Sequence, residues 1–172
     1  MDLLRSDTFF TNAPLSEKLL SINQAAENFP IVGPSKKMIK KLLLVEDNLA
    51  DVELVRLSVR ELATPVELVH IGDGQEFLNF TETHDGTGFS VILLDLNMHR
   101  VSGLDILRQL KTNSIFRDIP IVVFTTSNSK SDIKQCYELG ARAFVSKPFD
   151  IIEFNETIKA IVDFWLGVNL LA

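Results

Sequence analysis

Charged side chains follow three short apolar runs of this chain, each close to the point where its run ends. They are Glu46, Asp47, Asp95 and Lys147, and the runs are residues 42–45, 91–94 and 143–145. Grouped carboxylates can hold a divalent cation through their oxygens, and one of them can attack a phosphoryl group. A neighbouring ammonium can neutralise charge on the transferring oxygens. These residue types therefore indicate a phosphoryl-accepting site.

Separate roles can be assigned within this set. Asp95 is the candidate nucleophile, and Mg²⁺ is the expected cofactor because it prefers carboxylates, carbonyls and water. Asp47 and Asp95 are the candidate direct ligands. Glu46 is expected to act through water, and Asn97 through its backbone carbonyl. Thr125, which ends the apolar run 121–125, offers a hydroxyl to a phosphoryl oxygen.

Apolar runs without alternation are typical of parallel strands buried on both faces. Segments with helical spacing follow each run, and Asn48, Ser102, Ser129 and Asp150 stand before four of them as predicted N-caps. The predicted strands are 41–46, 66–71, 90–95, 121–125 and 143–146, and the predicted helices are 49–62, 75–82, 103–112, 130–139 and 151–166.

These five strand–helix units predict a flavodoxin-like (βα)5 fold, an α/β doubly wound parallel sheet with strand order 2-1-3-4-5. Strands 41–46 and 90–95 then flank the switch point, where ligands bind in such sheets. Each motif alone has an ordinary structural explanation, such as an acidic pair that compensates a helix dipole. Their joint occurrence at four strand ends favours a functional site.

The charge is unevenly spread along the 172 residues. Residues 1–41 carry six Lys/Arg against four Asp/Glu, whereas residues 42–172 carry eleven against nineteen. An acidic globular part is poorly suited to nucleic acid. Cys136 is the single cysteine, no apolar run reaches the ~18 residues needed to cross a bilayer, and no secretory signal is evident. We therefore expect a cytoplasmic location, with no nucleic-acid or membrane partner.

The first part of the chain differs from the rest. Residues 1–37 contain three clusters of helix- and strand-breaking residues and are predicted to be an irregular or short-helical extension. The globular domain is predicted to span residues 38–172. The alternative is that the extension docks on the domain through Phe9, Phe10 or Leu19.

Four short motifs together resemble the receiver domain of two-component response regulators. They are residues 44–48 (LVEDN), 94–98 (LDLNM), 125–127 (TTS) and 146–149 (SKPF). The resemblance covers about residues 40–166. It implies that Asp95 is the phosphoacceptor, Glu46 and Asp47 are the acidic metal pair, Thr125 is a switch hydroxyl and Lys147 contacts the phosphoryl group.

The resemblance also implies a histidine kinase as the phosphoryl donor, with a phosphotransfer protein as a further partner, and a signalling protein that is not itself an enzyme. Residues 73–78, 123–127 and 164–166 are similar to the phytochrome-type single-domain receivers, whose kinases sense light. About six residues follow the last predicted helix, so no output domain is expected.

Three positions depart from the usual pattern of that family. His99 stands where the family usually has proline, and it could make turnover pH-dependent or be a solvated loop residue. Phe144 occupies the position of a switch tyrosine, so it could switch by ring rotation but not through a hydroxyl. Glu46 is one methylene longer than aspartate.

Two other functions would also be compatible with an aspartate at the end of a buried strand. A haloacid-dehalogenase-like phosphatase also uses an aspartyl nucleophile, but it needs a second acid two residues later, where this chain has Asn97. A phosphorylation-independent docking module of receiver type would be expected to lack an acid or the lysine, and all are present.

The last predicted helix carries more apolar residues than one buried stripe requires. The predicted stripe is Ile151, Phe154, Ile158, Ile161, Val162 and Trp165, and the residues off it are Ile152, Phe164, Leu166 and Val168, followed by Leu170 and Leu171. Exposed apolar patches usually mark a partner surface. The phytochrome-type receivers, which this chain resembles, are expected to pair through their fourth helix, fifth strand and fifth helix. The resemblance therefore implies a two-fold symmetric homodimer through residues 130–139, 143–146 and 151–166. The alternative is a monomer whose residues 1–37 cover the patch.

Overall fold

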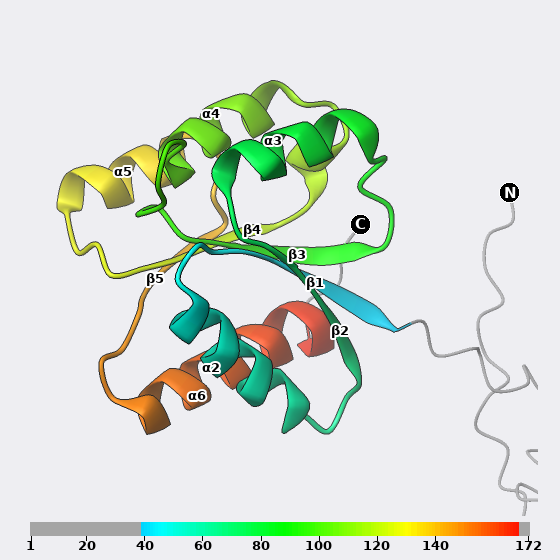
Figure 1. Ribbon diagram of the computed structural model, residues 1–172, viewed down its shortest axis with the longest axis vertical. Helices are drawn as coiled ribbons and strands as arrows, with labels where there is room; N and C mark the ends of the chain where they lie inside the picture. Colours follow the sequence, from blue (N-terminus) through cyan, green and yellow to red (C-terminus); the bar gives the residue numbers. More distant parts are fainter. Residues whose placement is uncertain (1–38, 169–172) are drawn as a thin grey trace, which may run out of the picture. The chain divides into compact units, whose positions relative to one another are not determined.

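The computed structural model describes residues 39–168 and contains one parallel sheet with strand order β2-β1-β3-β4-β5 (Figure 1). The predicted flavodoxin-like order is confirmed. The strands are β1 (Lys40–Val45), β2 (Val66–Ile71), β3 (Phe89–Leu94), β4 (Ile121–Thr125) and β5 (Ala143–Ser146). The helices are α2 (Leu49–Arg60), α3 (Gly74–Thr83), α4 (Gly103–Thr112), the 3-10 turn η1 (Phe116–Asp118), α5 (Lys130–Glu138), α6 (Ile151–Val162) and the π-helical η2 (Asp163–Val168).

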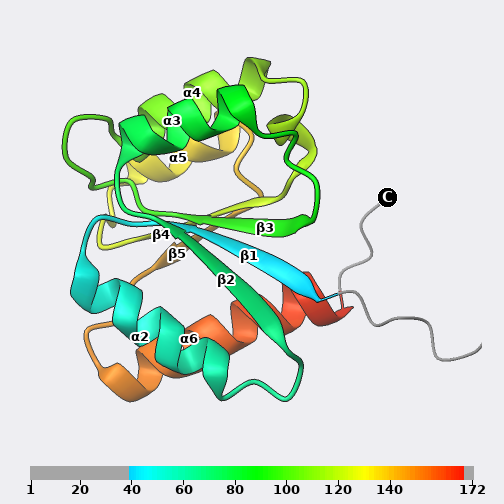
Figure 2. The ribbon, with the colours of Figure 1, turned by 45° about the vertical axis from the view of Figure 1, so that its right-hand side comes forward.

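Both faces of the sheet are covered by helices, as predicted from apolar runs that lack polar–apolar alternation. Helices α2 and α6 lie on one face, and α3, α4 and α5 lie on the other (Figure 2). Within β1, Leu42 and Leu44 belong to the core beneath α2 and α6, whereas Leu43 and Val45 belong to the core of the opposite face. This double burial anchors the central strands that carry the candidate site.

Side-chain caps set where the helices begin. Asn48 accepts a hydrogen bond from the backbone of Ala50, and Ser102, Ser129 and Asp150 cap α4, α5 and α6 in the same way, so the four predicted N-caps are confirmed. Asp73 caps α3. Strands β1 and β3 end one residue earlier than predicted, which places Glu46 and Asp95 at the first loop position after each strand.

The last helix differs from its prediction. It was expected to run to residue 166, but α6 ends at Val162 and the chain continues as the π-helical η2. Leu166 is buried although it was predicted to lie off the stripe. It stands four residues after buried Val162, and this helical spacing places the two on the same face. Ile151 was predicted to be buried and is 65% exposed, because it occupies the first helical position. Ile152 and Phe164 are exposed, as predicted.

The predicted extension, residues 1–37, and the residues Leu170 and Leu171 lie outside the described part of the chain, as does the side chain of Val168. The domain boundary near residue 38 therefore stays a prediction. Between residues 39 and 168, no helix has both the length and the apolar character needed to span a bilayer.

Candidate functional site

The acidic residues that follow β1 and β3 converge at the carboxyl edge of the sheet. Val45 and Leu94 are register partners in these paired strands, and the amide of Asp95 donates to the carbonyl of Val45 at 3.1 Å. One carboxylate oxygen from each of Glu46, Asp47 and Asp95 lies within 4.8 Å of the others. The structure therefore brings together the three acids that the sequence singled out.

Gly103, the first residue of α4, is required by the close approach of that helix to Asp95. A Cβ atom at position 103 would lie 2.2 Å from the Asp95 carbonyl oxygen and 2.8 Å from the Cα of Leu96. The amide of Gly103 donates to the Leu96 carbonyl at 3.1 Å. The backbone that carries Asp95 is thus held directly against the start of α4.

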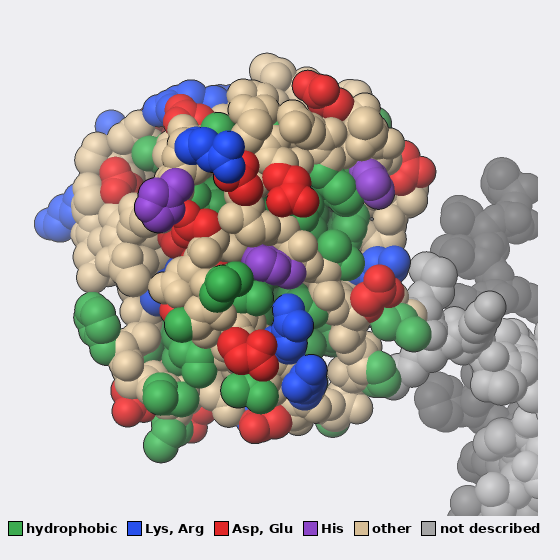
Figure 3. All heavy atoms as spheres, in the orientation of Figure 1, with side chains coloured by type: hydrophobic (Ala, Val, Ile, Leu, Met, Phe, Trp, Pro, Cys, Tyr) green, Lys and Arg blue, Asp and Glu red, His purple; other side chains and the backbone are tan. Residues whose placement is uncertain are grey.

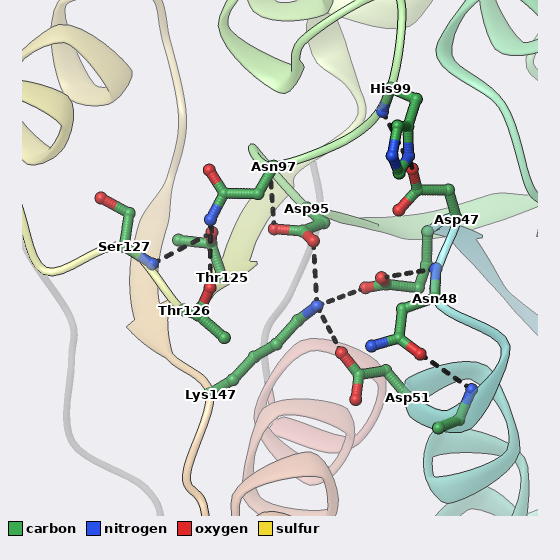
Figure 4. A network of polar contacts seen from close by, with 12 residues as sticks. Asp47, Asn48, Asp51, Asp95, Asn97, His99, Thr125, Thr126, Ser127 and Lys147 are labelled. Atoms are coloured by element: carbon green, nitrogen blue, oxygen red, sulfur yellow. Dashed lines mark hydrogen bonds and ion pairs between the residues drawn. The ribbon is translucent and has the colours of Figure 1, made fainter.

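Lys147 reaches the acidic cluster from the loop after β5 (Figure 4). Its Nζ lies 2.6 Å from Glu46 Oε2, 2.8 Å from Asp51 Oδ2 and 3.0 Å from Asp95 Oδ2. Its backbone amide donates to the Thr125 carbonyl at 2.8 Å, which ties this loop to the end of β4. The lysine side chain is 4% exposed, so it is effectively a buried counter-ion for three carboxylates.

Asp51 was not among the predicted site residues. It lies in the first turn of α2, four residues after Asp47. An acid one helical turn beyond a strand-end acid points back toward the same edge of the sheet. That spacing was the signal in the sequence that could have identified it.

Burial and mutual charge shift the protonation of the site. Desolvation raises the pKa of Glu46 to about 7, and the nearby Asp95 adds to this effect, while Lys147 partly opposes it. For Lys147, burial alone would lower the pKa, but the charges of Glu46 and Asp95 outweigh burial and hold the pKa above its ordinary value. The lysine therefore stays charged, whereas Glu46 titrates near neutrality.

Asp95 opens onto a small polar cavity. Its Oδ1 accepts a hydrogen bond from the backbone of Asn97 at 3.1 Å, while Oδ2 faces Lys147. The cavity has a volume of about 360 Å³ and is lined by Asp47, Asn48, Asp51, Asp95, Asn97, His99, Thr126 and Lys147. A phosphoryl group and a hydrated cation are of a size to fit beside the Asp95 carboxylate.

Asn97 connects the β3 loop to the end of β4. Its Nδ2 donates to Thr125 Oγ1 at 3.3 Å and to Thr126 Oγ1 at 3.0 Å. The Thr125 hydroxyl also accepts from the backbone of Ser127 at 3.3 Å, and the Thr125 side chain is fully buried. Thr126, which was not predicted as a site residue, thus helps to join the two loops.

Phe144 does not line this cavity. It is partly buried in β5 and packs against the core on the side of α3, α4 and α5. Of the predicted site residues, it is the one whose side chain takes no part in the polar contacts of the site and is placed by core packing.

The donor set of the cluster fits a hard divalent cation. Its three candidate ligand side chains are carboxylates, and no cysteine is among them. Such oxygen ligands suit Mg²⁺ or Mn²⁺, whereas zinc is usually held by nitrogen and sulfur.

His99 makes an unexpected contact with this cluster. Its Nδ1 lies 2.6 Å from Asp47 Oδ2, and its backbone amide donates to the same oxygen at 2.9 Å. The imidazole is 93% exposed, yet it is not a free loop histidine. Desolvation would raise the pKa of Asp47, but the two His99 donors outweigh it and lower that pKa.

Comparison with known proteins points to one family. The family model for the response regulator receiver domain matches residues 42–159. Over 131 residues the chain is 34% identical to the probable methanogenesis regulatory protein FilR2 of Methanothrix harundinacea, covering 74% of this chain and 84% of that protein. It is 32% identical over 131 residues to the response regulator Rcp1 of Synechocystis, covering 74% of this chain and 89% of Rcp1.

Two solved structures resemble this one in both fold and sequence. The phosphorylated cyanobacterial phytochrome response regulator RcpA has a TM-score of 0.73 and 31% identity, covering 77% of this chain and 98% of RcpA. The Mn²⁺-bound form of Rcp1 has a TM-score of 0.72 and 31% identity, covering 77% of this chain and 99% of Rcp1. The chain therefore belongs to the response regulator receiver domain family of two-component signal transduction, and within it resembles the phytochrome-type single-domain regulators.

Proposed function

We propose that this chain is a single-domain response regulator that accepts a phosphoryl group from a histidine kinase onto Asp95, with Mg²⁺ as its cofactor. One observation carries the proposal: the Asp95 carboxylate faces a cavity of about 360 Å³ while a buried lysine stands 3.0 Å from its Oδ2. A nucleophile, a metal-binding acid pair and a counter-ion for the incoming phosphoryl group thus lie within one site.

In the proposed reaction, an oxygen of Asp95 attacks the phosphorus of a phosphohistidine. The new P–O bond forms as the P–N bond breaks, and the electron pair of the broken bond remains on the imidazole nitrogen of the donor. Lys147 can leave its carboxylate partners to neutralise the phosphoryl oxygens. The cation would be held by Glu46, Asp47, Asp95 and the Asn97 carbonyl. When bound, Mg²⁺ supplies positive charge that screens the carboxylate from the phosphoryl group.

The switch is proposed to act through Thr125. In its contacts with Asn97 and Ser127, both at 3.3 Å, the Thr125 hydroxyl is the acceptor, so it keeps its own proton to donate to a phosphoryl oxygen. Movement of the hydroxyl toward the phosphoryl group would lengthen these contacts and release the loop before α5. Phe144 is proposed to follow by ring rotation, since it lies on β5 and packs against the core on the same side as α5. The proposed output of phosphorylation is a changed protein surface.

The donor must approach Asp95 through the cavity mouth, and exposed apolar side chains lie in the segments that follow two of the lining residues, Asn48 and Lys147. Leu49 is 75% exposed, Phe149 is 96% exposed and Ile152 is 70% exposed. Figure 3 shows hydrophobic side chains gathered over the start of α6 and the neighbouring part of α2. This surface supports docking of a histidine kinase or a phosphotransfer protein. The likeness to the cyanobacterial phytochrome regulator RcpA supports a photoreceptor kinase as the donor.

We also propose a homodimer through α5, β5 and α6. Phe164 is 51% exposed, and its ring packs edge-on against Trp165 at a centroid distance of 5.1 Å. An exposed phenylalanine held by a half-buried tryptophan is suited to a two-fold interface. Sedimentation of the wild type and of Phe164→Asp at tens of micromolar tests it. A wild-type monomer, or a dimer indifferent to the substitution, would overturn the dimer.

Phosphotransfer profiling tests the function itself. Each histidine kinase encoded in the source genome is autophosphorylated and mixed with the wild-type chain or with Asp95→Asn. We expect rapid transfer from one kinase or a few to the wild type, and no transfer to Asp95→Asn. Transfer from no kinase, or equal labelling of both proteins, would contradict the proposal.

A further inference from the structure

The contact between His99 and Asp47 converges on a single carboxylate oxygen. Both the ring Nδ1 and the backbone amide of His99 meet Asp47 Oδ2, at 2.6 Å and 2.9 Å. In Figure 4 the Asp47 carboxylate lies between His99 and Asp95, and its second oxygen points toward Asp95. With Oδ2 engaged by two donors, the other oxygen is the one presented to the acidic cluster.

The loop that carries His99 is held in place independently of that contact. Arg100 has a φ of 65°, and the Val101 amide donates to the His99 carbonyl at 2.7 Å, which defines a γ-turn with positive φ. A non-glycine residue in this conformation stores strain and persists only where its surroundings impose it. The Arg100 guanidinium is paired with Asp73, the N-cap of α3.

Packing against α3 also restrains this loop. A Cβ atom at Gly74, the first residue of α3, would lie 2.6 Å from the Val101 carbonyl oxygen. The absence of a side chain at Gly74 therefore lets the loop approach the helix closely. The start of α3 therefore fixes the position of the loop that carries His99, and this loop in turn directs the two His99 donors toward Asp47.

We propose that His99 is a positioning residue that orients the Asp47 carboxylate for the divalent cation. It does so by occupying Oδ2 and leaving the second oxygen for the metal. Hydrogen bonds to ligating carboxylates raise metal affinity because they fix ligand orientation, and removing them typically costs 10–100-fold. Proline, the residue usual in the family at this position, has neither an amide N–H nor an imidazole. The inference rests on the proposed function because it assumes that the acidic cluster binds a cation.

Metal titration of the full chain tests the proposal, with Mg²⁺ by calorimetry and Mn²⁺ by electron paramagnetic resonance. His99→Ala removes the ring but keeps the backbone donor, and we expect about tenfold weaker binding of either ion. His99→Asn offers an amide nitrogen near the place of Nδ1 and should restore most of the affinity. His84→Ala, at the C-cap of α3, is the matched control and should bind as the wild type does.

The outcomes separate this inference from the proposed site. If Asp47→Ala loses binding but His99→Ala weakens it by less than about threefold or tightens it, the positioning role is wrong and the metal site stands. Nitrogen coupling from a directly coordinated imidazole in the Mn²⁺ spectrum of the wild type would also overturn it, because His99 would then be a ligand. If Asp47→Ala and Asp95→Asn both bind normally, the metal site itself is wrong.

Discussion

The Lys147 ammonium lies 3.0 Å from the Asp95 carboxylate, although 52 residues separate them in the chain. The two groups meet because β3 and β5 end at the same edge of one parallel sheet. Both side chains are almost fully buried, at 4% and 6% exposure. Ionised groups buried to this extent need partners. Removing either partner would therefore leave the other charge buried without compensation, and this pairing is also proposed to be the one that the phosphoryl group disrupts.

Replacing Lys147 by methionine should destabilise the metal-free protein by about 3–5 kcal/mol, because three carboxylates lose their buried counter-ion. Denaturant unfolding in the presence of a chelator measures the loss. Saturating Mg²⁺ should recover part of it by supplying positive charge. Lys159→Met is the matched control, since Lys159 pairs with exposed Glu61 at 2.7 Å and should change the stability much less. Equal losses for the two variants would contradict the assigned role of Lys147.

Glu46 should make the metal-free protein more stable as the pH falls toward 5. Its pKa is about 7 in the folded chain and ordinarily 4.5, so the folded state binds a proton that the unfolded state lacks between these values. This contribution is fully present below the ordinary pKa and is lost as the pH rises through 7. Denaturant unfolding in the presence of a chelator, repeated at several pH values, measures this contribution to the stability. Glu46→Gln should flatten the dependence, and an unchanged slope in that variant would rule out Glu46 as the cause.

Cation binding should release a proton from the same residue. Because Glu46 must be ionised to serve the metal, Mg²⁺ affinity should rise between about pH 6 and pH 8. Calorimetry in buffers of different ionisation enthalpy counts the protons released. Binding enthalpies that do not depend on the buffer at about pH 6.5 would argue against this linkage.

Thr125→Ala should still accept the phosphoryl group but fail to pass the change to the following loop. Thr125 supplies the hydroxyl that joins Asn97 to the Ser127 amide, and it is not the nucleophile. Amide chemical shifts of residues 126–130, recorded before and after phosphorylation, check this prediction. Thr125→Ser keeps a hydroxyl and should behave as the wild type. Shifts in Thr125→Ala as large as those in the wild type would count against a switch role.

Deleting residues 1–37 should leave phosphorylation and melting temperature nearly unchanged, because their breaker-rich composition predicts little buried area. Thermal unfolding and phosphate incorporation of the truncated chain measure both. A loss of stability above about 2 kcal/mol, comparable to losing one large buried side chain, would show that this segment docks on the domain.

The sequence was sufficient to predict the sheet and the acids, because the central buried strands β1 and β3 are continuous apolar runs and each is followed directly by an acid. Asp95 and Lys147 could be assigned to one site on that basis, since the topology alone brings strand ends together. Thr125 could be assigned to the same edge because it is the last residue of the run that forms β4.

Contacts that depend on loop shape could not be predicted in this way. The approach of His99 to Asp47 requires a positive φ at Arg100, and nothing in the local sequence specifies that conformation. The burial of Leu166, by contrast, was predictable, because Leu166 stands four residues after Val162 and this spacing places both on the same helix face. Asp51 was missed although its helical spacing from Asp47 was readable.

Intact-mass analysis of the chain after treatment with acetyl phosphate and Mg²⁺ tests the central claim most directly. We expect a single added phosphoryl group on the wild type that hydroxylamine removes, as an acyl phosphate requires, and peptide mapping should place it on Asp95. Asp95→Asn, which is nearly isosteric and lacks only the nucleophilic oxygen, should fold and gain no mass. A phosphoryl group of equal stoichiometry on Asp95→Asn, or one that resists hydroxylamine, would contradict the account.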